Sequence, residues 1–155
     1  MKIEKATKKD LKELDKIKGC KMPKLHISRL EQQKKRKAIY FIAYEKNKPV
    51  GHVFVYLKGN ENYHSCPTLQ DVFVKETERK KGFGRMLMNK VEQKLKNLSY
   101  KKIGLDVETG EKWLKKFYES GGYKVIGKIH QQTWTQKDSG KKMITKVWHL
   151  EKKLR

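Results

Sequence analysis

Apolar and polar positions along the chain follow two spacings, one typical of helices and one typical of strands. Short apolar, aromatic or β-branched runs predict strands at the N-terminus and at residues 39–44, 50–57, 69–74, 103–107, 123–135 and 143–150. Helical spacing predicts helices over residues 7–18, 83–98 and 113–120, and a weaker one from residue 28. The order is a strand, two helices, three strands, a helix, a strand, a helix and two strands. It predicts an α/β fold with a mixed sheet.

Local signals mark where some of these elements begin and end. Thr7 and Asp10 have the spacing of a capping box, which opens a helix. The pair Gly121-Gly122 follows a helical pattern, as glycine often does at a helix C-terminus. No internal repeat or low-complexity linker interrupts the chain. The 155 residues fit a single domain over residues 1–155.

Charge is the most unusual property of the composition. The chain has 39 Lys and Arg against 17 Asp and Glu, a formal net charge of +22, spread over nearly the whole length. Such a field attracts polyanions and repels cationic ligands. Phosphate-bearing cofactors, nucleic acid and a ribosome surface are therefore candidate partners. A lysine-rich proteome would produce the same composition without any polyanionic partner.

The remaining composition excludes several classes of protein. Cys20 and Cys66 stand apart, so they indicate neither a disulfide framework nor a zinc site, and we expect both to be reduced and no metal to be bound. No apolar run approaches the ~18 residues of a membrane-spanning helix. The start Met1 to Lys5 lacks the apolar region of a signal peptide. We therefore expect a cytoplasmic protein with no membrane partner.

The stretch from Arg79 to Gly84 lies between a predicted strand and a predicted helix and offers a site for phosphate. Its glycines let the backbone come close to a ligand. The first turn of the helix provides free N–H groups and the positive end of the helix dipole. An ordinary tight turn would use the same residues, so the loop alone is weak evidence. The Gly-Lys-Ser/Thr ending of a P-loop and the third glycine of a dinucleotide fingerprint are both absent.

Three segments, in order, resemble the GNAT (GCN5-related N-acetyltransferase) superfamily. The Arg-x-x-Gly-x-Gly pattern of residues 79–84 resembles the cofactor loop of that family. Residues 117–123 resemble its Leu-Tyr-Glu-Lys-x-Gly-Phe stretch, and residues 69–74 its Leu-Glu-Asp-Leu-Tyr-Val strand. The resemblance covers nearly the whole chain and implies a GNAT fold, with a mixed, mostly antiparallel central sheet flanked by about four helices. It also implies an N-acetyltransferase with acetyl-CoA as cosubstrate.

The resemblance assigns cofactor contacts to two stretches of the chain. Main-chain groups of the strand before the loop pair with the pantetheine arm, and one of their N–H groups polarises the thioester carbonyl. The loop cradles the pyrophosphate, mainly through backbone N–H groups. The strand residues would serve equally as core residues, since these contacts use the backbone. The residues assigned are Val72, Phe73, Val74, Arg79, Lys80, Lys81, Gly82, Phe83, Gly84 and Arg85.

The catalytic residues are less fully defined. The resemblance makes Tyr118 the general acid that protonates the leaving coenzyme A thiolate, with a core tyrosine as the alternative. Gln70 stands where the family often has an acidic residue, and an amide cannot act as a base. Asp71 is the candidate base, although strand alternation predicts that it points away from the face of Gln70. The alternatives are an ordered water, Asp106, Glu108 and His64.

Glu111 is a second departure from the family pattern. Many members have Asn near this point, at the start of a helix, where it contacts the cofactor. Glu111 is suited instead to the N-terminal end of the helix, where a negative charge is favourable. The cofactor contact from that side is therefore in doubt.

The resemblance leaves the acceptor as a primary amine on a small molecule or a protein. A polyamine or aminoglycoside fits a basic protein poorly, unless a local acidic pocket forms from Glu61, Asp71, Asp106 and Glu108. A neutral or anionic amine fits the charge better. So does a protein amine on an anionic partner such as the ribosome.

A function of another class is also open. The chain would then be a catalytically idle GNAT-like module that binds RNA or the ribosome through its basic surface. In that case Trp134 and Trp148 would stack on bases, although tryptophans are more often core residues. Many members of the family are dimers, so the resemblance leaves a homodimer open as well.

Overall fold

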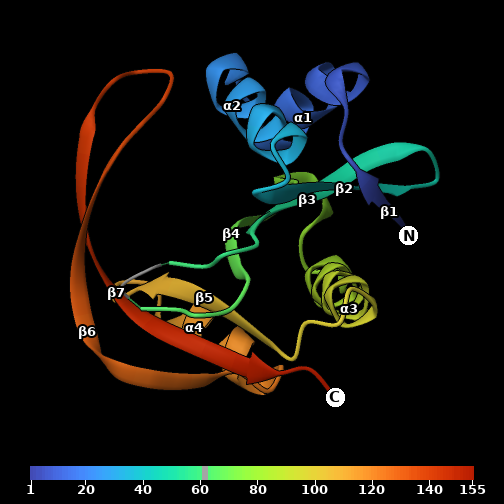
Figure 1. Ribbon diagram of the computed structural model, residues 1–155. Coiled ribbons are helices and arrows are strands. Elements are labelled where there is room, and N and C mark those ends of the chain that lie inside the picture. The colour runs from blue at the N-terminus through green and yellow to red at the C-terminus, as the bar shows by residue number, and fades with distance from the viewer. Residues whose placement is uncertain (61–62) are drawn as a thin grey trace.

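The computed structural model describes residues 1–60 and 63–155, and in that part of the chain its centre is a sheet of seven strands (Figure 1). None of the described helices is long and apolar enough to cross a membrane. The strands are β1 (Lys2–Lys5), β2 (Ala38–Glu45), β3 (Lys48–Tyr56), β4 (Thr68–Val74), β5 (Lys102–Glu108), β6 (Lys124–Thr135) and β7 (Lys142–Lys153). The helices are α1 (Leu11–Lys18), α2 (Pro23–Lys34), α3 (Phe83–Asn97) and α4 (Lys112–Ser120), with short 3-10 helices at Lys8–Asp10 and Glu76–Glu78. The element order predicted from the hydrophobic pattern is confirmed.

The helix α2 begins earlier than the hydrophobic pattern predicts. It starts at Pro23 rather than near residue 28. Proline is favoured in the first turn of a helix, where its missing N–H would have no partner inside the helix. Just before it, the Met22 N–H donates a hydrogen bond of 2.9 Å to Asp15. The start of α2 is therefore set by local backbone chemistry rather than by apolar spacing.

The strands are ordered β1-β2-β3-β4-β5-β7-β6, and β4 and β5 run parallel while the other described neighbours are antiparallel. This confirms the mixed, mostly antiparallel sheet. In the described residues, β4 and β5 are joined by two residue pairs, Thr68 with Gly104 and Leu69 with Leu105. We call this short parallel contact the seam. It divides the sheet into one part made of β1 to β4 and another made of β5 to β7.

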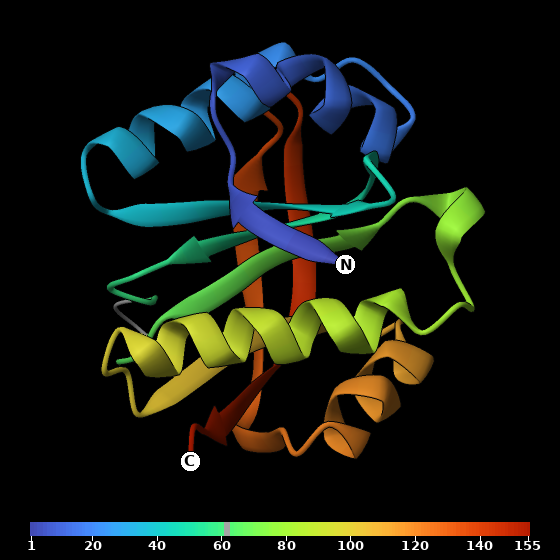
Figure 2. The same ribbon diagram turned by 90° about the vertical axis from the view of Figure 1, so that its right-hand side faces the viewer.

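Helices cover both faces of the sheet, and each face has its own apolar core (Figure 2). Side chains of β2 alternate between the two cores, so the strand has no charged residue before Glu45. On one face α3 and α4 pack on the sheet, with a core that includes Phe41, Val53, Leu87, Val91, Leu95 and Tyr118. On the other face α1 and α2 cover a smaller core that includes Leu14, Ile17, Tyr40, Ile42 and Phe54.

The last two strands extend beyond the sheet as a long curved hairpin (Figure 1). An irregularity in the β6–β7 register between Ile126 and His130, with Gly127 at a φ of 60°, marks the bend. We call residues 130–147, beyond this bend, the arch. Such bulges re-aim a strand without ending its pairing, so the arch leaves the sheet but remains a regular hairpin.

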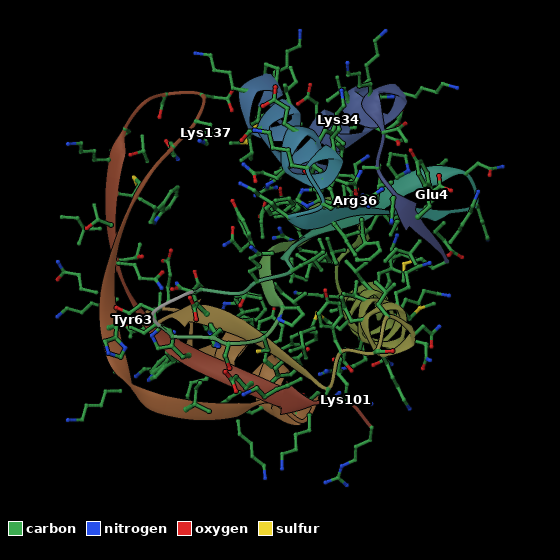
Figure 3. The ribbon with its side chains drawn as sticks, in the orientation of Figure 1. Glu4, Lys34, Arg36, Tyr63, Lys101 and Lys137 are labelled. Carbon is green, nitrogen blue, oxygen red and sulfur yellow. The ribbon has the colours of Figure 1, made fainter. Side chains whose placement is uncertain are left out.

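The tip of the arch is attached to the start of α2. Asp138 accepts hydrogen bonds from the backbone N–H groups of Lys24, 3.1 Å, and Leu25, 3.3 Å. Figure 3 shows Tyr63 near the foot of the arch and Lys137 near its tip, beside α2. A carboxylate at a helix N-terminus satisfies N–H groups that have no partner inside the helix. The arch therefore closes over the α1–α2 face of the sheet.

Candidate active site

The edge of β4 beyond the seam is open toward β5. On its other side β4 remains paired with β3, with Phe73 opposite His52 and Val74 opposite Gly51. The main-chain groups of residues 72–74 that face β5 therefore have no strand partner in the described chain. A backbone edge of this kind binds an extended ligand as an added strand would. Val72, Phe73 and Val74, predicted to contact the pantetheine arm, lie at this edge.

The predicted phosphate loop leads from this edge into α3. Gly82 occupies the position before the helix with a φ of 82°, in the left-handed region that favours glycine. The Met86 N–H donates to the Gly82 carbonyl, 3.1 Å. The N–H groups of Phe83, Gly84 and Arg85 lie in the turn before this bond, where a helix has no internal acceptors for them. This turn is suited to bind a phosphate group.

Two basic side chains of the loop have partners within the loop itself. The Arg79 Nε donates to the Val74 carbonyl, 3.0 Å, and the Lys81 ammonium pairs with Glu78, 2.9 Å. Lys80 is exposed, and its φ of 62° marks a tight backbone turn. These contacts hold the shape of the loop, so the groups left free to meet a ligand are mainly its backbone N–H groups.

Arg85 lies at the start of α3 but points toward α4. Its guanidinium donates to the Phe117 carbonyl, 2.7 Å, and to the Ser120 hydroxyl, 2.8 Å. It also lies 4.3 Å from the centroid of the Phe117 ring. These contacts join α3 to α4. The predicted phosphate contact of Arg85 would have to be made in addition to them.

Tyr118, the predicted general acid, is on α4 and belongs to the core of the α3–α4 face. It is 5% exposed and packs edge-to-face against Tyr123. Burial raises the pKa of Tyr118 and outweighs the nearby Arg85 charge, which lowers it. The phenol therefore keeps its proton at neutral and moderately alkaline pH, as a proton donor must.

The strand β4 contains a bulge that changes which side chains share a face. Phe54 lies opposite Gln70 and His52 lies opposite Phe73, so Val53 faces two residues of β4 instead of one. Asp71 is one of these two, with a φ of 52°. Both Gln70 and Asp71 line the same cavity. The predicted alternation, with Asp71 on the face opposite Gln70, is therefore wrong, because the bulge breaks the two-residue period.

Asp71, the predicted base, is held by two cations. Its carboxylate lies 2.5 Å from the Lys18 ammonium of α1 and 2.7 Å from the Arg29 guanidinium of α2. Burial alone would raise the pKa of Asp71, but the neighbouring positive charges outweigh it and hold that pKa well below its usual range. Such a carboxylate is a weak base. It binds both helices to β4.

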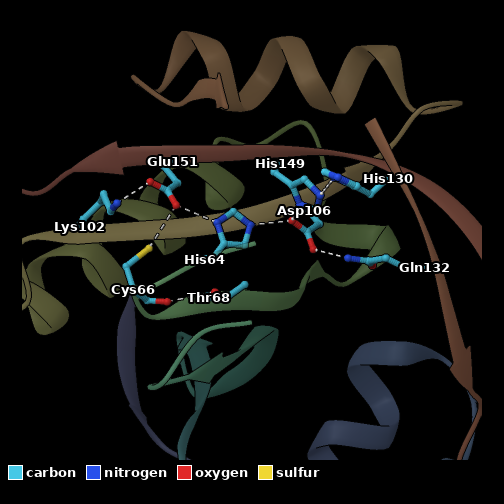
Figure 4. Close-up of polar contacts among 9 residues, drawn as sticks. All are labelled: His64, Cys66, Thr68, Lys102, Asp106, His130, Gln132, His149 and Glu151. Atoms are coloured by element: carbon cyan, nitrogen blue, oxygen red, sulfur yellow. Dashed lines mark hydrogen bonds and ion pairs between the residues drawn. The ribbon is translucent and has the colours of Figure 1, made fainter. Parts of the chain in front are cut away.

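Asp106 accepts hydrogen bonds from three side chains (Figure 4). Its Oδ1 lies 2.7 Å from the His64 Nε2 and 2.6 Å from the His149 Nδ1, and its Oδ2 accepts from the Gln132 amide at 3.0 Å. Burial would raise the pKa of Asp106, but these hydrogen bonds lower it overall. Asp106 is therefore an ionised carboxylate with its acceptor positions largely occupied.

His64 carries the charge that balances this carboxylate. Its other ring nitrogen, Nδ1, lies 3.0 Å from Glu151, so the ring bridges two carboxylates. Burial lowers the pKa of His64, but hydrogen bonds to Asp106 and other neighbours outweigh it and raise the pKa to about 10. The ring packs directly on Gly104, where an added Cβ would lie 2.6 Å from its Nδ1. Glycine at this position is thus required by the close approach of His64.

Two sets of side chains in the described residues have ligand atoms close enough for a metal ion, namely His64 with Cys66 and Glu151, and His64 with Asp106 and His149. Zinc ligands at about 2.1 Å in a tetrahedral arrangement lie about 3.4 Å from one another. The separations of 2.6 and 2.7 Å around Asp106 are shorter and match hydrogen bonds. Hydrogen bonding therefore explains the second set without a metal.

A cavity of about 910 Å³ lies between the arch, α1, α2 and the strands at the seam. Its lining includes three carboxylates, Asp71, Asp106 and Glu108. Asp71 and Asp106 are paired as described, whereas Glu108 is exposed and forms no ion pair with any described residue. Glu61, the fourth member of the predicted acidic pocket, lies outside the described residues. The cavity thus borders the seam, and the open edge of β4 leads from the seam toward the turn before α3.

Comparison with known proteins identifies this arrangement. The sequence matches the Acetyltransferase (GNAT) family over residues 9–123. The chain belongs to the GNAT family of acetyltransferases. No curated protein sequence matches it significantly.

Solved structures confirm the GNAT fold. The ribosomal-protein-S18-alanine N-acetyltransferase of Escherichia coli aligns with a TM-score of 0.74 at 15% identity, covering 99% of this chain and 93% of the other. Naa20 of Chaetomium thermophilum, in complex with a bisubstrate analogue, aligns with a TM-score of 0.73 at 15% identity, covering 99% and 87%. A GNAT acetyltransferase of Elizabethkingia anophelis with acetyl-CoA bound aligns with a TM-score of 0.66 at 19% identity, covering 99% and 97%. At these identities the likeness establishes the fold.

Membership of the GNAT family supports acetyl-CoA as the cosubstrate, and the geometry fits it. The open edge of β4 leads in one direction along the chain to the free N–H groups at the start of α3. Glu111 is the residue before α4, as predicted, and its carboxylate accepts a hydrogen bond of 2.7 Å from the Trp113 indole. This GNAT protein thus holds Glu111 within α4's own first turn.

Sequence reasoning missed several residues of the hydrogen-bonded group around Asp106. His149 is directly opposite Asp106 in the β5–β7 register, and its Nε2 lies 2.9 Å from the His130 Nδ1. Gln132 reaches Asp106 from the arch. The signal that would have found them is the pairing of β5 with β7. These two strands are about 40 residues apart in the sequence, and α4 and β6 lie between them. A single sequence does not define that register.

Proposed function

We propose that this protein is an N-acetyltransferase that transfers the acetyl group of acetyl-CoA to a primary amine by direct attack within a ternary complex. The observation that carries the proposal is the continuity of the open β4 edge with the N-terminus of α3. A pantetheine arm along the edge brings the pyrophosphate to the helix start. One of the N–H groups of residues 72–74 would stabilise the oxyanion of the tetrahedral intermediate.

Glu108 is the proton acceptor in this proposal. An amine with a pKa near 10 is mostly protonated at neutral pH, so it must lose a proton before it attacks. Among the described carboxylates that line the cavity, Asp71 is held by Lys18 and Arg29, and Asp106 accepts from three donors. Glu108 has neither kind of partner. The earlier assignment of the base to Asp71 stays a prediction, and its two ion pairs favour a structural role.

Tyr118 is the proton donor in this proposal. The attacking nitrogen forms a bond to the thioester carbon, and collapse of the tetrahedral intermediate breaks the carbon–sulfur bond. The thiolate that leaves takes the phenolic proton of Tyr118, which burial keeps in place. Glu108 lies on the cavity side of the sheet, where the amine would bind, whereas Tyr118 belongs to the core of the α3–α4 face. Proton acceptance and proton donation would thus occur on opposite sides of the open edge.

The test of this proposal is a calorimetric titration with acetyl-CoA, with ATP as a polyanion control at moderate salt. We expect one-site binding of acetyl-CoA that ATP does not reproduce. Gly82→Trp should abolish it, because the indole occupies the turn and the required φ of 82° is unfavourable for any residue with a side chain. Lys9→Trp, far from the loop in sequence and exposed, is the matched control and should bind acetyl-CoA normally.

Equal, weak binding of acetyl-CoA and ATP would contradict the proposal. The positive field would then act without a specific site. A salt-dependent RNA affinity under the same conditions would favour the RNA- or ribosome-binding module that the net charge of +22 also predicts. The same sample, run through an analytical ultracentrifuge, tests the homodimer that the family resemblance leaves open.

A further inference from the structure

The arch forms one wall of the cavity. It does so with the edge of strand β6 rather than with a face of the hairpin. Seven consecutive residues of β6 and the segment after it line the cavity, whereas β7 contributes the alternate residues Thr145 and Val147. Alternation is expected where a strand presents a face, since successive side chains point to opposite sides. The seven residues are Gln131, Gln132, Thr133, Trp134, Thr135, Gln136 and Lys137.

This edge of β6 has free main-chain groups. β6 is the last strand of the sheet, and in the described chain it pairs with β7 on one side alone. Exposed edge strands present rows of unpaired N–H and C=O groups, which readily pair with another extended chain. Here the edge borders the cavity. An occupant of the cavity therefore meets main-chain donors and acceptors over several residues.

The charges of the cavity restrict the occupant to few positive groups. Of its three described carboxylates, Glu108 is the one without an ion pair, because Asp71 and Asp106 are neutralised by Lys18, Arg29 and His64. Apart from the cations Lys18, Arg29 and Lys137, the other lining side chains are uncharged, and most of them can donate or accept hydrogen bonds. A polyamine would bring several cations to one free carboxylate. A single amine followed by a neutral, hydrogen-bonding chain matches the cavity better.

The arch also restricts the shape of the occupant. Asp138 joins its tip to the N-terminus of α2, so the cavity is bordered by the arch on one side and by α1 and α2 on the other. A slender, extended chain end can lie in such a space. A lysine on the surface of a folded protein would require the Asp138 contact to open.

We propose that the acceptor is the amino terminus of an extended polypeptide, which lies under the arch, pairs its main chain with the free edge of β6 and directs its terminal amine toward Glu108. This inference rests on the N-acetyltransferase function proposed above. It names a polypeptide α-amine as the substrate class and β6 as the element that holds it. Main-chain pairing supplies affinity that depends little on side chains.

The test uses acetyl-CoA and a pool of lysine-free hexapeptides with free amino termini and randomised first two residues. Release of the coenzyme A thiol and the mass of the products report acetylation. We expect the pool to be acetylated with a higher kcat/KM than spermidine or a dipeptide amide. Glu108→Gln should lower kcat for the pool, and Glu119→Gln, on the exposed side of α4, is the matched control that should not.

Backbone N-methylation tests the pairing with β6 directly. In a paired strand alternate N–H groups face the partner strand. Two versions of one accepted hexapeptide are therefore compared, methylated at positions 2 and 4 or at positions 3 and 5. We expect one version to lose about tenfold or more in kcat/KM, mainly through KM, and the other to lose little, since each lost main-chain hydrogen bond accounts for about tenfold at most.

The outcomes separate this inference from the proposed function. If acetyl-CoA itself fails to bind in the calorimeter, the N-acetyltransferase proposal falls and this inference falls with it. If acetyl-CoA binds and spermidine or a small monoamine is acetylated but the peptide pool is not, this inference alone is overturned. If the peptides are acetylated and both methylated versions behave alike, the pairing with the β6 edge is overturned.

Discussion

The two faces of the sheet are stabilised in different ways. On the α3–α4 face, apolar side chains such as Leu87 and Val91 form a continuous core. On the face that borders the cavity, paired charges lie among the elements, with Asp71 between α1 and α2 and His64 between β5 and β7. Apolar contacts are many and weak, so each depends little on one partner. A buried ion pair depends strongly on both partners, and it fixes orientation as well as proximity. The first face suits a scaffold, and the second suits a site that must hold its groups in place.

The largest effect on stability is expected for His64→Gln. Removing the imidazolium leaves Asp106 and Glu151 without their shared counter-charge, which typically costs about 3–5 kcal/mol for a buried pair. The pKa of His64 is about 10 in the folded protein and about 6.5 when unfolded. Its stabilisation is therefore complete below about pH 6.5 and is lost as the pH rises toward 10. Urea unfolding at pH 6 and pH 9.5 measures this, and an equal loss at both pH values would exclude the charged bridge.

Leu87→Ala makes the matching change on the apolar face. Leu87 is fully buried against the sheet, so its truncation should cost about 3 kcal/mol through lost contacts and a cavity. Leucine has no ionisable group, so the loss of unfolding free energy should be the same at pH 6 and pH 9.5 in the same urea experiment. A pH-dependent loss of stability at this position would contradict the conclusion that apolar packing alone stabilises this face.

Tyr118→Phe separates catalysis from packing on the apolar face. The phenyl ring keeps the contacts with Tyr123, but it cannot donate a proton. We expect kcat to fall about 100-fold or more, as general acid catalysis contributes 10²–10⁴-fold. The Kd for acetyl-CoA should not change. A kcat near that of the unchanged protein would return Tyr118 to the role of a core residue.

Asp138→Ala is expected to have the smallest effect on stability. Loss of a carboxylate that caps a helix costs about 1 kcal/mol, and the contact lies at the tip of the arch. Asp138→Asn keeps an acceptor oxygen and serves as the control, with a smaller loss. Thermal unfolding measures both variants. In the peptide assay Asp138→Ala should raise KM for the acceptor and leave the Kd for acetyl-CoA unchanged. A changed Kd for acetyl-CoA with an unchanged peptide KM would mean that the arch affects cofactor binding rather than acceptor binding.

The scaffold and the cofactor side could be predicted from sequence because their signals are local. The capping box at Thr7 is one example, since its hydrogen bonds join residues three positions apart. The glycine at position 82 is another, because the left-handed turn and the helix that follows lie within one short stretch. Helix periods and strand runs are likewise read within a window of residues.

The cavity side could not be predicted because it depends on contacts between distant residues. Asp71 is neutralised by Lys18 and Arg29, which are 53 and 42 residues away. The bulge that turns Asp71 into the cavity follows from the β3–β4 register, and the sequence pattern of β4 gives no sign of it. For the same reason Asp71 was a reasonable candidate for the base, and Glu108 is distinguished from it by what surrounds each of them in space.

The seam has a mechanical consequence. In the described chain two residue pairs join β4 to β5, so the two halves of the sheet are held at the gap mainly by the apolar core that spans both. We expect a long ligand seated in the gap to contact both halves and to limit their relative motion. The free protein is then more compliant across the gap than the loaded one, and its amides in β5 should exchange with solvent faster. Binding of a ligand at the open edge of β4 would thus affect the rigidity of the sheet on both sides of the seam.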